Sequence, residues 1–267
     1  MSTITNHPSW LCELSREPVS EADCLACARQ RLQSDCPFNP AILKALAEAN
    51  APDVGLSGLH QIGYPVLRVS GLVGCARKSW YGRTRSPMLE TPSEHWSRLR
   101  GTIFHAALES MGEGHVERRL TAFLYDDQVA AFITGRIDGY NPANGVLTDY
   151  KTAIRLPSRV RPHHQRQLWL YAWLLWKNGV GLPASIRVIY IHMRAIRSFD
   201  AVTPTEQDLA ELERSLLQRL HLILAAEPPA ARPEESWECK FCGYAECPML
   251  KALAGERNGK ADESLQV

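Results

Sequence analysis

The sequence predicts an α/β domain with a central mixed sheet flanked by helices, and three observations carry this prediction. Residues 133–140 and 146–152 have the pattern of two short strands, and the turn-forming residues 141–145 between them indicate a β-hairpin. Residues 165–178 place apolar side chains at helical spacing. Residues 185–193 alternate and are rich in β-branched side chains, which is typical of a sheet strand.

Further helices are expected on either side of this core. Ser93 is a candidate N-cap for a helix over 93–111. Thr203–Glu206 combines a capping box with proline at the first helical position, and it predicts a helix with an apolar face that continues to Ile223. The N-terminal cysteine-bearing segment, residues 12–36, is loop-like in composition.

Composition sets broad limits. A chain of 267 residues with 45% hydrophobic content can bury one sizeable core and carry a small second module. The formal charge of +1 means that any nucleic-acid surface must come from local clusters of Arg and Lys. We expect a cytoplasmic protein without membrane contact, because no apolar run is long enough to cross a bilayer and the N-terminus lacks the parts of a signal peptide.

The hairpin carries the first candidate site. Asp149 and Lys151 are two residues apart on one strand, so they face the same side while Tyr150 faces the other. Pairing across the turn brings Asp138 close to the level of Asp149. Two neighbouring carboxylates repel unless a divalent cation such as Mg²⁺ or Mn²⁺ neutralises them. With a lysine beside it, such a cation favours nuclease chemistry. The alternative is a solvated turn with ordinary surface charges.

Four cysteines near the N-terminus suggest a second site. Eight cysteines in a reducing compartment are expected to be metal ligands rather than disulfides. The first four form a C-x₁₁-C-x₂-C-x₈-C pattern that suits a tetrahedral zinc site, with a chelating pair of usual spacing. They are Cys12, Cys24, Cys27 and Cys36. The alternatives are that only Cys24 and Cys27 matter, or that all four are free thiols.

The other four cysteines are split across the chain. Cys75 stands alone, while Cys239, Cys242 and Cys247 form a C-x₂-C-x₄-C run near the C-terminus. Four thiolates suit either an iron-sulfur cluster or zinc, and their spacing does not choose between them.

Two basic segments are candidate DNA contacts. One follows Cys75 and interleaves basic with aromatic residues, which suits phosphate contact and base stacking on single strands. Its residues are Arg77, Lys78, Trp80 and Tyr81. The alternative is a solvated basic turn with Trp80 in the core. The other segment follows the hairpin and could grip the phosphate backbone, or could be a solvated loop. Its residues include Arg155, Arg159 and Arg161.

Taken together and in order, these motifs resemble the PD-(D/E)XK nuclease superfamily, in particular its RecB-like branch. The matching residues are Gly135, Asp138, Asp149, Tyr150, Lys151, Thr152, Gln167 and Tyr171, with Gly101 and His105 upstream. The resemblance implies a restriction-endonuclease-like core. It also implies that His105, Asp138, Asp149 and the Tyr150 carbonyl hold Mg²⁺ or Mn²⁺, that Lys151 assists hydrolysis, and that Gln167 and Tyr171 orient the substrate or Lys151.

The placement of the second cysteine group resembles the Cas-four family, the CRISPR-associated iron-sulfur exonucleases. This resemblance implies a [4Fe-4S] cluster on Cys75, Cys239, Cys242 and Cys247, with zinc as the runner-up. The expected organisation is a cysteine-rich extension at 1–63, a nuclease domain closed by an iron-sulfur subdomain at 64–250, and a polar tail at 251–267.

The resemblance implies exonucleolytic hydrolysis of DNA at single-stranded ends, such as CRISPR prespacers, with CRISPR integrase subunits as partners. Two alternatives stay open. One is a non-catalytic DNA-binding or scaffold subunit of an integration complex. The other is a repair or mobile-element nuclease outside CRISPR.

Overall fold

The chain packs into two compact units in the computed structural model. The structure describes residues 10–33, 35–50, 56–85, 89–111, 115–233, 238–239, 242–244 and 246–249. Unit 1 comprises Met1–Ser57 and Leu89–Gly112, and unit 2 comprises Gly58–Met88 and Glu113–Val267. The helix that carries His105 therefore groups with the cysteine-rich segment.

Unit 1 is a small helical body. Its elements are β1 (Trp10–Leu11), β2 (Pro18–Val19), α1 (Glu21–Gln30), α2 (Pro40–Asn50) and α6 (Pro92–Met111). Its core contains Trp10, Leu25, Leu43, Leu46 and Leu99. The expectation of loop-like sequence around Cys24 was wrong, because Ser20 caps a helix there by accepting a hydrogen bond from the Asp23 amide at 3.0 Å. Thr91, not Ser93, exchanges capping hydrogen bonds with Glu94 at the start of α6.

The four cysteines of unit 1 converge on one cavity of about 440 Å³, which Cys12, Cys24, Cys27 and Cys36 all help to line. Cys24 and Cys27 lie one turn apart on α1. Burial, followed by the charges of Cys36, Cys12 and Cys27, raises the pKa of the Cys24 thiol to about 12. All eight cysteines lie among the described residues, and none of them is joined in a disulfide.

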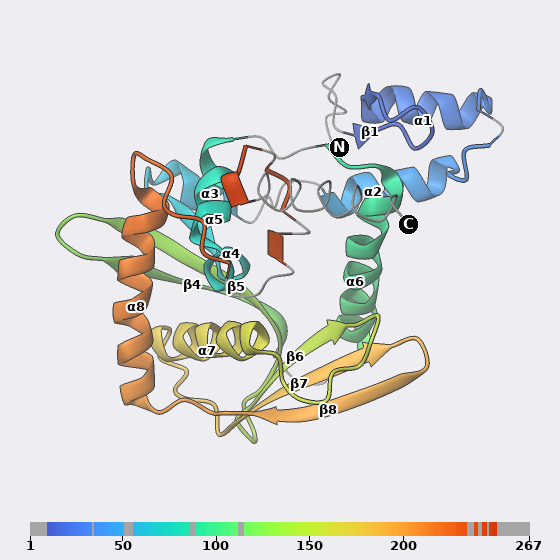
Figure 1. Ribbon diagram of the computed structural model, residues 1–267. Helices are drawn as coiled ribbons and strands as arrows, with labels where there is room; N and C mark the ends of the chain where they lie inside the picture. The colour runs from blue at the N-terminus through green and yellow to red at the C-terminus, as the bar shows by residue number, and fades with distance from the viewer. Residues whose placement is uncertain are drawn as a thin grey trace, which may run out of the picture. The chain divides into compact units, whose positions relative to one another are not determined.

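Unit 2 is built on a mixed sheet (Figure 1). Its strands are β3 (Val66–Arg68), β4 (His115–Tyr125), β5 (Ala130–Asn141), β6 (Val146–Thr152), β7 (Ser185–His192) and β8 (Ala195–Ala201). The strand order is β3-β5-β6-β7-β8, and β4 pairs with β5 beside this path. The β3–β5 and β6–β7 pairs are parallel, whereas β4–β5, β5–β6 and β7–β8 are antiparallel. The predicted mixed sheet is confirmed.

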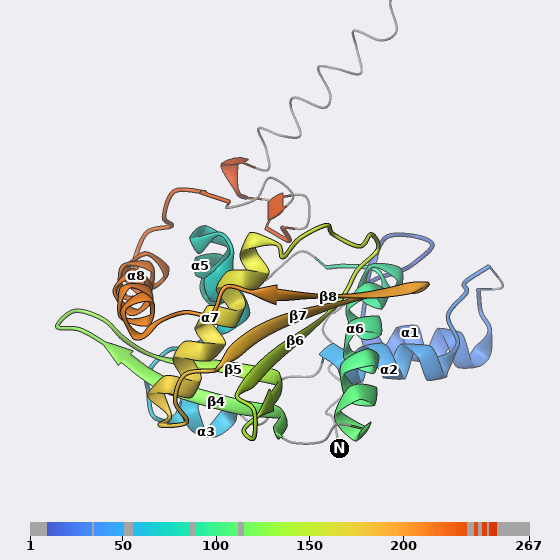
Figure 2. The same ribbon diagram turned by 90° about the horizontal axis from the view of Figure 1, so that it is seen from below.

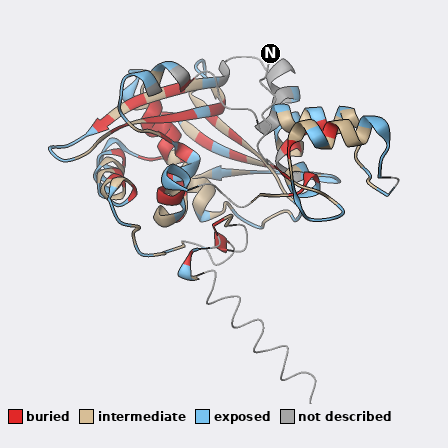
Figure 3. Cartoon of the chain, turned by 90° about the horizontal axis from the view of Figure 1, so that it is seen from above, coloured by how far each residue is buried: buried red, intermediate tan, exposed pale blue. Residues whose placement is uncertain are grey.

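Helices flank this sheet. They are α3 (Ser57–Gln61), α4 (Val69–Val73), α5 (Ala76–Thr84), α7 (Pro162–Lys177) and α8 (Glu206–Leu224). Figure 2 shows α7 lying along the sheet, and Figure 3 shows buried residues alternating along the strands beneath it. The α7 segment Leu170–Leu175 is almost completely buried, so this helix is the central element of the core. Within the described residues, no helix has the length and apolarity needed to cross a bilayer.

Two sequence expectations about unit 2 need correction. The cap of α8 is Thr205, not Thr203: its hydroxyl accepts from the Asp208 amide while the Asp208 carboxylate accepts from the Thr205 amide. Strand β4 was not anticipated at all. Buried Leu120, Ala122 and Leu124 alternate with less buried neighbours in this strand. Phe123 and Tyr125 between and after them are also apolar, so the sequence itself lacks a clear two-residue period.

Candidate active site

The hairpin places its carboxylates where its two strands separate. Regular β5–β6 pairing begins at the turn and ends at Gly139 opposite Thr148. Beyond this pair, the amide of Tyr150 is no longer used by the β5 ladder. It donates instead to the Asp138 carboxylate at 2.8 Å. The prediction that Asp138 lies close to the level of Asp149 is confirmed, because both residues lie directly beyond the last paired residues, Gly139 and Thr148, as seen from the turn. The Asp138 side chain lies where the two strands separate.

Asp149 and Lys151 form a buried ion pair. The Asp149 side chain is fully buried, and the Lys151 amine lies 2.9 Å from Oδ1 and 2.8 Å from Oδ2. Burial is the largest influence on the pKa of Asp149, and it raises that pKa. The charge of Lys151 lowers the pKa and the charge of nearby Asp138 raises it, so that the pKa of Asp149 is about 7. Burial lowers the pKa of Lys151, but the charges of Asp149 and Asp138 outweigh this effect and raise it overall. Lys151 therefore remains charged beside a carboxylate that titrates near neutrality.

Gly135 allows α7 to approach the hairpin. A Cβ atom at this position would lie 2.8 Å from Tyr171 and 2.9 Å from both Leu174 and Val69. Any larger residue would force at least one of these three side chains to shift. The Tyr171 hydroxyl accepts a hydrogen bond of 2.7 Å from the Gln167 amide nitrogen. Burial, then the charges of Asp149 and Asp138, raise the pKa of Tyr171, so its hydroxyl stays protonated near the acidic pair.

His164 and Tyr190 support the lysine side of the site and were missed in the sequence. Tyr190 pairs with Lys151 in the β6–β7 register. Its hydroxyl lies 2.8 Å from Nδ1 of His164 and accepts from the Arg161 amide at 3.1 Å. Burial, followed by the charges of Lys151, His163 and Arg161, lowers the pKa of His164 to about 2. No local pattern indicates this role, because it depends on strand register.

The donor set at the hairpin fits a hard divalent cation. Oδ2 of Asp149 is buried and has no hydrogen-bond partner among the described residues, although the Lys151 amine is near. Two carboxylates are a typical protein contribution to Mg²⁺, which keeps several waters. In the described part of the chain, no three His, Cys, Asp or Glu side chains gather as a metal site. His105 lies on α6 of unit 1, so its role as a ligand stays a prediction.

The cysteines of unit 2 come together from both ends of the domain. Cys75, Cys239, Cys242 and Cys247 line one cavity of about 20 Å³. Buried Glu238 accepts the Cys75 amide at 2.8 Å and thereby ties the C-terminal segment to the start of α5. Four thiols are a suitable donor set for a soft metal. The cavity has room for about one water-sized atom, so a cluster of four irons would require these segments to move apart.

Most side chains of the first basic segment, which follows Cys75, make contacts within the fold. Trp80 and Tyr81 are buried and pack with Tyr244 and Cys247. The Trp80 indole donates to the Ala225 carbonyl at 2.8 Å. Arg77 donates to the carbonyls of Pro228 and Pro229. The expected stacking of DNA bases on Trp80 and Tyr81 is therefore corrected, because both rings are already used in the core. Lys78 is exposed, as are Arg155 and Arg159 in the second segment.

Comparison with known proteins agrees with this fold. The family model of the PD-(D/E)XK nuclease superfamily matches residues 115–247. The crystal structure of SSO0001 is similar, with a TM-score of 0.56 and 21% identity over 78% of this chain and 94% of that chain. A search of curated proteins found no match.

Two further solved structures are less similar. A provisionally named exonuclease from Eubacterium rectale has a TM-score of 0.33 and 17% identity, covering 55% of this chain and 60% of that chain. A phage-related exonuclease from Haemophilus somnus 129PT has a TM-score of 0.36 and 12% identity, covering 61% of this chain and 96% of that chain.

The chain thus carries a PD-(D/E)XK nuclease superfamily domain. The matched residues contain the complete hairpin, α7 and the three C-terminal cysteines, whereas His105 and Cys75 lie before them. The mixed sheet flanked by helices is the fold expected of this superfamily.

Proposed function

We propose that the protein is a metal-dependent nuclease that hydrolyses DNA phosphodiesters. One observation carries the proposal. Asp149 is fully buried with Lys151 at 2.9 Å, and Asp138 stands at the same break in the sheet. Buried charges are costly unless they are paired or coordinate a metal. A fold could satisfy its core better with apolar residues here, so the arrangement supports a chemical role for these groups.

The residues of the site divide the work. Asp138 and Asp149 would hold Mg²⁺ or Mn²⁺, together with the Tyr150 carbonyl and His105. When bound, the cation supplies Lewis-acid activation of water and charge neutralisation at the phosphate. The Lys151 ammonium presents a positive charge to the phosphate and stabilises the charge that develops there. Gln167 holds the Tyr171 hydroxyl by its hydrogen bond, and together they limit how the substrate and Lys151 can lie.

Replacement of the lysine tests this function. Lys151→Ala should reduce cleavage of single-stranded DNA with Mn²⁺ by roughly a hundredfold or more, as expected when a charge-stabilising group is removed. The exposed lysine of α2 offers a matched control, and Lys44→Ala should cleave like the wild type. Thermal unfolding of both variants checks that the fold survives. Cleavage by Lys151→Ala at the wild-type rate would reject the site.

The finer assignment rests on the resemblance to the Cas-four family. We propose exonuclease action on single-stranded ends, with CRISPR prespacers as substrates and integrase subunits as partners. The convergence of Cys75 with the three C-terminal cysteines on one cavity supports it. Digestion of end-labelled and circular single strands tests the end requirement: an exonuclease leaves the circle intact. Equal digestion of the circle would contradict this assignment.

The two cysteine groups are proposed metal sites: a [4Fe-4S] cluster in unit 2 and Zn²⁺ in unit 1. Each group of four cysteines lines a cavity of its own, which supports both proposals. Among the described residues the thiols do not yet stand as close as metal ligands, and the cavity of unit 2 would have to widen, so both proposals include a closer arrangement of the thiols around the bound metal. Anaerobic purification followed by iron, sulfide and zinc analysis tests them together. Cys242→Ser should lose iron and sulfide but retain zinc, and Cys27→Ser should do the reverse. If the protein contained zinc but no iron, the [4Fe-4S] proposal would be rejected in favour of zinc at the cysteines of unit 2.

A further inference from the structure

A second cavity lies beside the carboxylate site and has no role in the chemistry described so far. It measures about 430 Å³, within the range of pockets that hold one small ligand. Its walls come from β3, α4, α5, the start of α7, and the C-terminal segments. All of these elements belong to unit 2.

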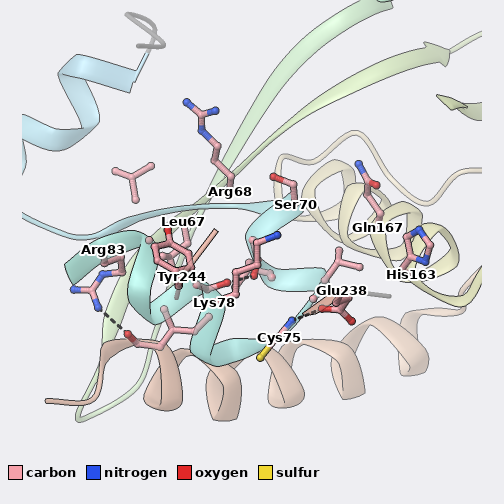
Figure 4. A pocket seen from close by; sticks show the side chains of 18 residues that line it. Leu67, Arg68, Ser70, Cys75, Lys78, Arg83, His163, Gln167, Glu238 and Tyr244 are labelled. Atoms are coloured by element: carbon pink, nitrogen blue, oxygen red, sulfur yellow. Dashed lines mark hydrogen bonds between the residues drawn. The ribbon is translucent and has the colours of Figure 1, made fainter. Parts of the chain in front are cut away.

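The cavity touches the catalytic residues through one side chain. Gln167 lines it and also donates to the hydroxyl of Tyr171, whose ring packs against Gly135 on the strand that carries Asp138. A ligand in the cavity would therefore contact the residue that holds Tyr171. Figure 4 shows Gln167 and His163 on α7, across the cavity from Lys78 on α5.

The lining suits a nucleotide with its phosphate. Three cationic side chains, Arg68, Lys78 and Arg83, border the cavity, against the single carboxylate of Glu238. That carboxylate already accepts the Cys75 amide. Apolar side chains such as Leu67 and Leu72 also contribute to the walls. An excess of positive charge attracts phosphate, while apolar walls accept a sugar and base without a requirement for sequence.

We propose that this cavity binds a nucleotide of the single-stranded DNA substrate next to the one that is cleaved. This inference rests on the proposed nuclease function and adds a positioning subsite to it. The cavity would hold the strand while the neighbouring phosphodiester lies at Asp138, Asp149 and Lys151. Lys78, which also lines the thiol cavity, would contact a phosphate of the bound nucleotide.

A matched pair of serine substitutions tests the subsite. Ser70 is exposed in the first turn of α4 and lines the cavity, whereas Ser215 is exposed on α8 and does not. Ser70→Glu and Ser215→Glu change the net charge equally. A carboxylate in the first turn of a helix is also favourable, so Ser70→Glu should not weaken the fold. Any difference in DNA binding between the two variants therefore reports the cavity.

Binding is measured by fluorescence anisotropy with an oligothymidine probe, and Lys151→Ala is the background in every variant, so that cleavage does not interfere. Ser70→Glu should weaken binding several-fold relative to Ser215→Glu. Lys78→Ala should lower the slope of log affinity against log salt by about 0.7, the value for one lost phosphate contact on a single strand. Equal binding by the two serine variants, or an unchanged slope for Lys78→Ala, would overturn the subsite.

Cleavage by the otherwise wild-type protein separates this inference from the function beneath it. Absence of cleavage with Mg²⁺ and Mn²⁺, combined with the expected binding differences, would reject the nuclease activity and retain the strand-binding cavity. Cleavage at the wild-type level by both Ser70→Glu and Lys78→Ala at limiting DNA would reject the cavity and retain the nuclease.

Discussion

The segments 76–85 and 155–166 have similar compositions and different surroundings. Both are rich in Arg, and both lie next to residues of a candidate site. In the first, Trp80 and Tyr81 are buried, and Arg77 and Arg83 donate to main-chain carbonyls of the C-terminal half. In the second, Arg155 and Arg159 are exposed. Two arginine side chains of the first segment therefore hold parts of the fold together, whereas Arg155 and Arg159 of the second segment are exposed to solvent.

The difference follows from what each segment packs against. Helix α5 lies next to α8, where carbonyl groups at and beyond the end of that helix need donors. The second segment connects β6 to α7 and runs along the surface until Arg161, whose amide donates to Tyr190. A basic side chain is thus a weaker candidate for DNA contact where it already donates to main-chain carbonyls, as Arg77 does, than where it is exposed, as Lys78, Arg155 and Arg159 are.

The largest expected effect is that of Trp80→Ala. Removal of a buried tryptophan should lower the free energy of unfolding by about 3–5 kcal/mol. It also leaves the Ala225 carbonyl without the indole donor. Urea unfolding followed by circular dichroism measures the loss. If Trp80→Ala kept the wild-type stability but lost DNA affinity, Trp80 would be a DNA contact. Segment 76–85 would then bind DNA rather than hold the fold together.

His164 marks the point at which the second segment enters the fold. Its pKa is about 2 in the folded protein and near 6.5 when unfolded, so the unfolded chain takes up a proton first as the pH falls. The stability that comes from the neutral imidazole is full above pH 6.5 and is lost progressively below it. One proton corresponds to a slope of about 1.4 kcal/mol per pH unit.

Comparison of the wild type with His164→Gln isolates this effect from that of Asp149. The pKa of Asp149 is raised to about 7, so its contribution to stability is lost as the pH rises toward 7, which is the opposite direction. Below pH 6, the free energy of unfolding should fall more steeply for the wild type than for the variant. Parallel curves from pH 4 to 8 would show that His164 is not buried in its neutral form.

The smallest effect on stability is expected for Arg155→Ala and Arg159→Ala. Exposed side chains usually change the free energy of unfolding by less than about 0.5 kcal/mol. Each substitution should nevertheless lower the salt slope of single-strand binding by about 0.7, if each arginine contacts one phosphate. Anisotropy titrations at several salt concentrations measure this slope. Unchanged slopes for both variants would leave the second segment as a solvated loop.

The extent to which the sequence predicts the molecule depends on how local each feature is. The hairpin, α7 and β7 follow from patterns within a few residues, and the approach of Asp138 to the level of Asp149 follows from the turn between them. The burial of Trp80 depends on Ala225, 145 residues away, and Glu238 meets Cys75 across 163 residues. No pattern near Trp80 or Cys75 contains that information.

The support of Lys151 by Tyr190 and His164 depends in the same way on the β6–β7 register, which the sequence motifs did not specify. The resemblance to the family motif singled out Gln167 and Tyr171 on α7. They lie one turn apart on the helix, and a hydrogen bond joins their side chains. Their approach to the hairpin depends on the space left by Gly135.

The account as a whole depends on a cation shared by Asp138 and Asp149, and calorimetric titration with Mn²⁺ tests it most directly. The wild type should bind Mn²⁺ more tightly as the pH rises toward 7, because the proton on Asp149 competes with the metal, and the affinity should level off above that pH. Asp149→Asn should lose this binding at every pH. Equal Mn²⁺ affinity of the variant and the wild type would contradict the site.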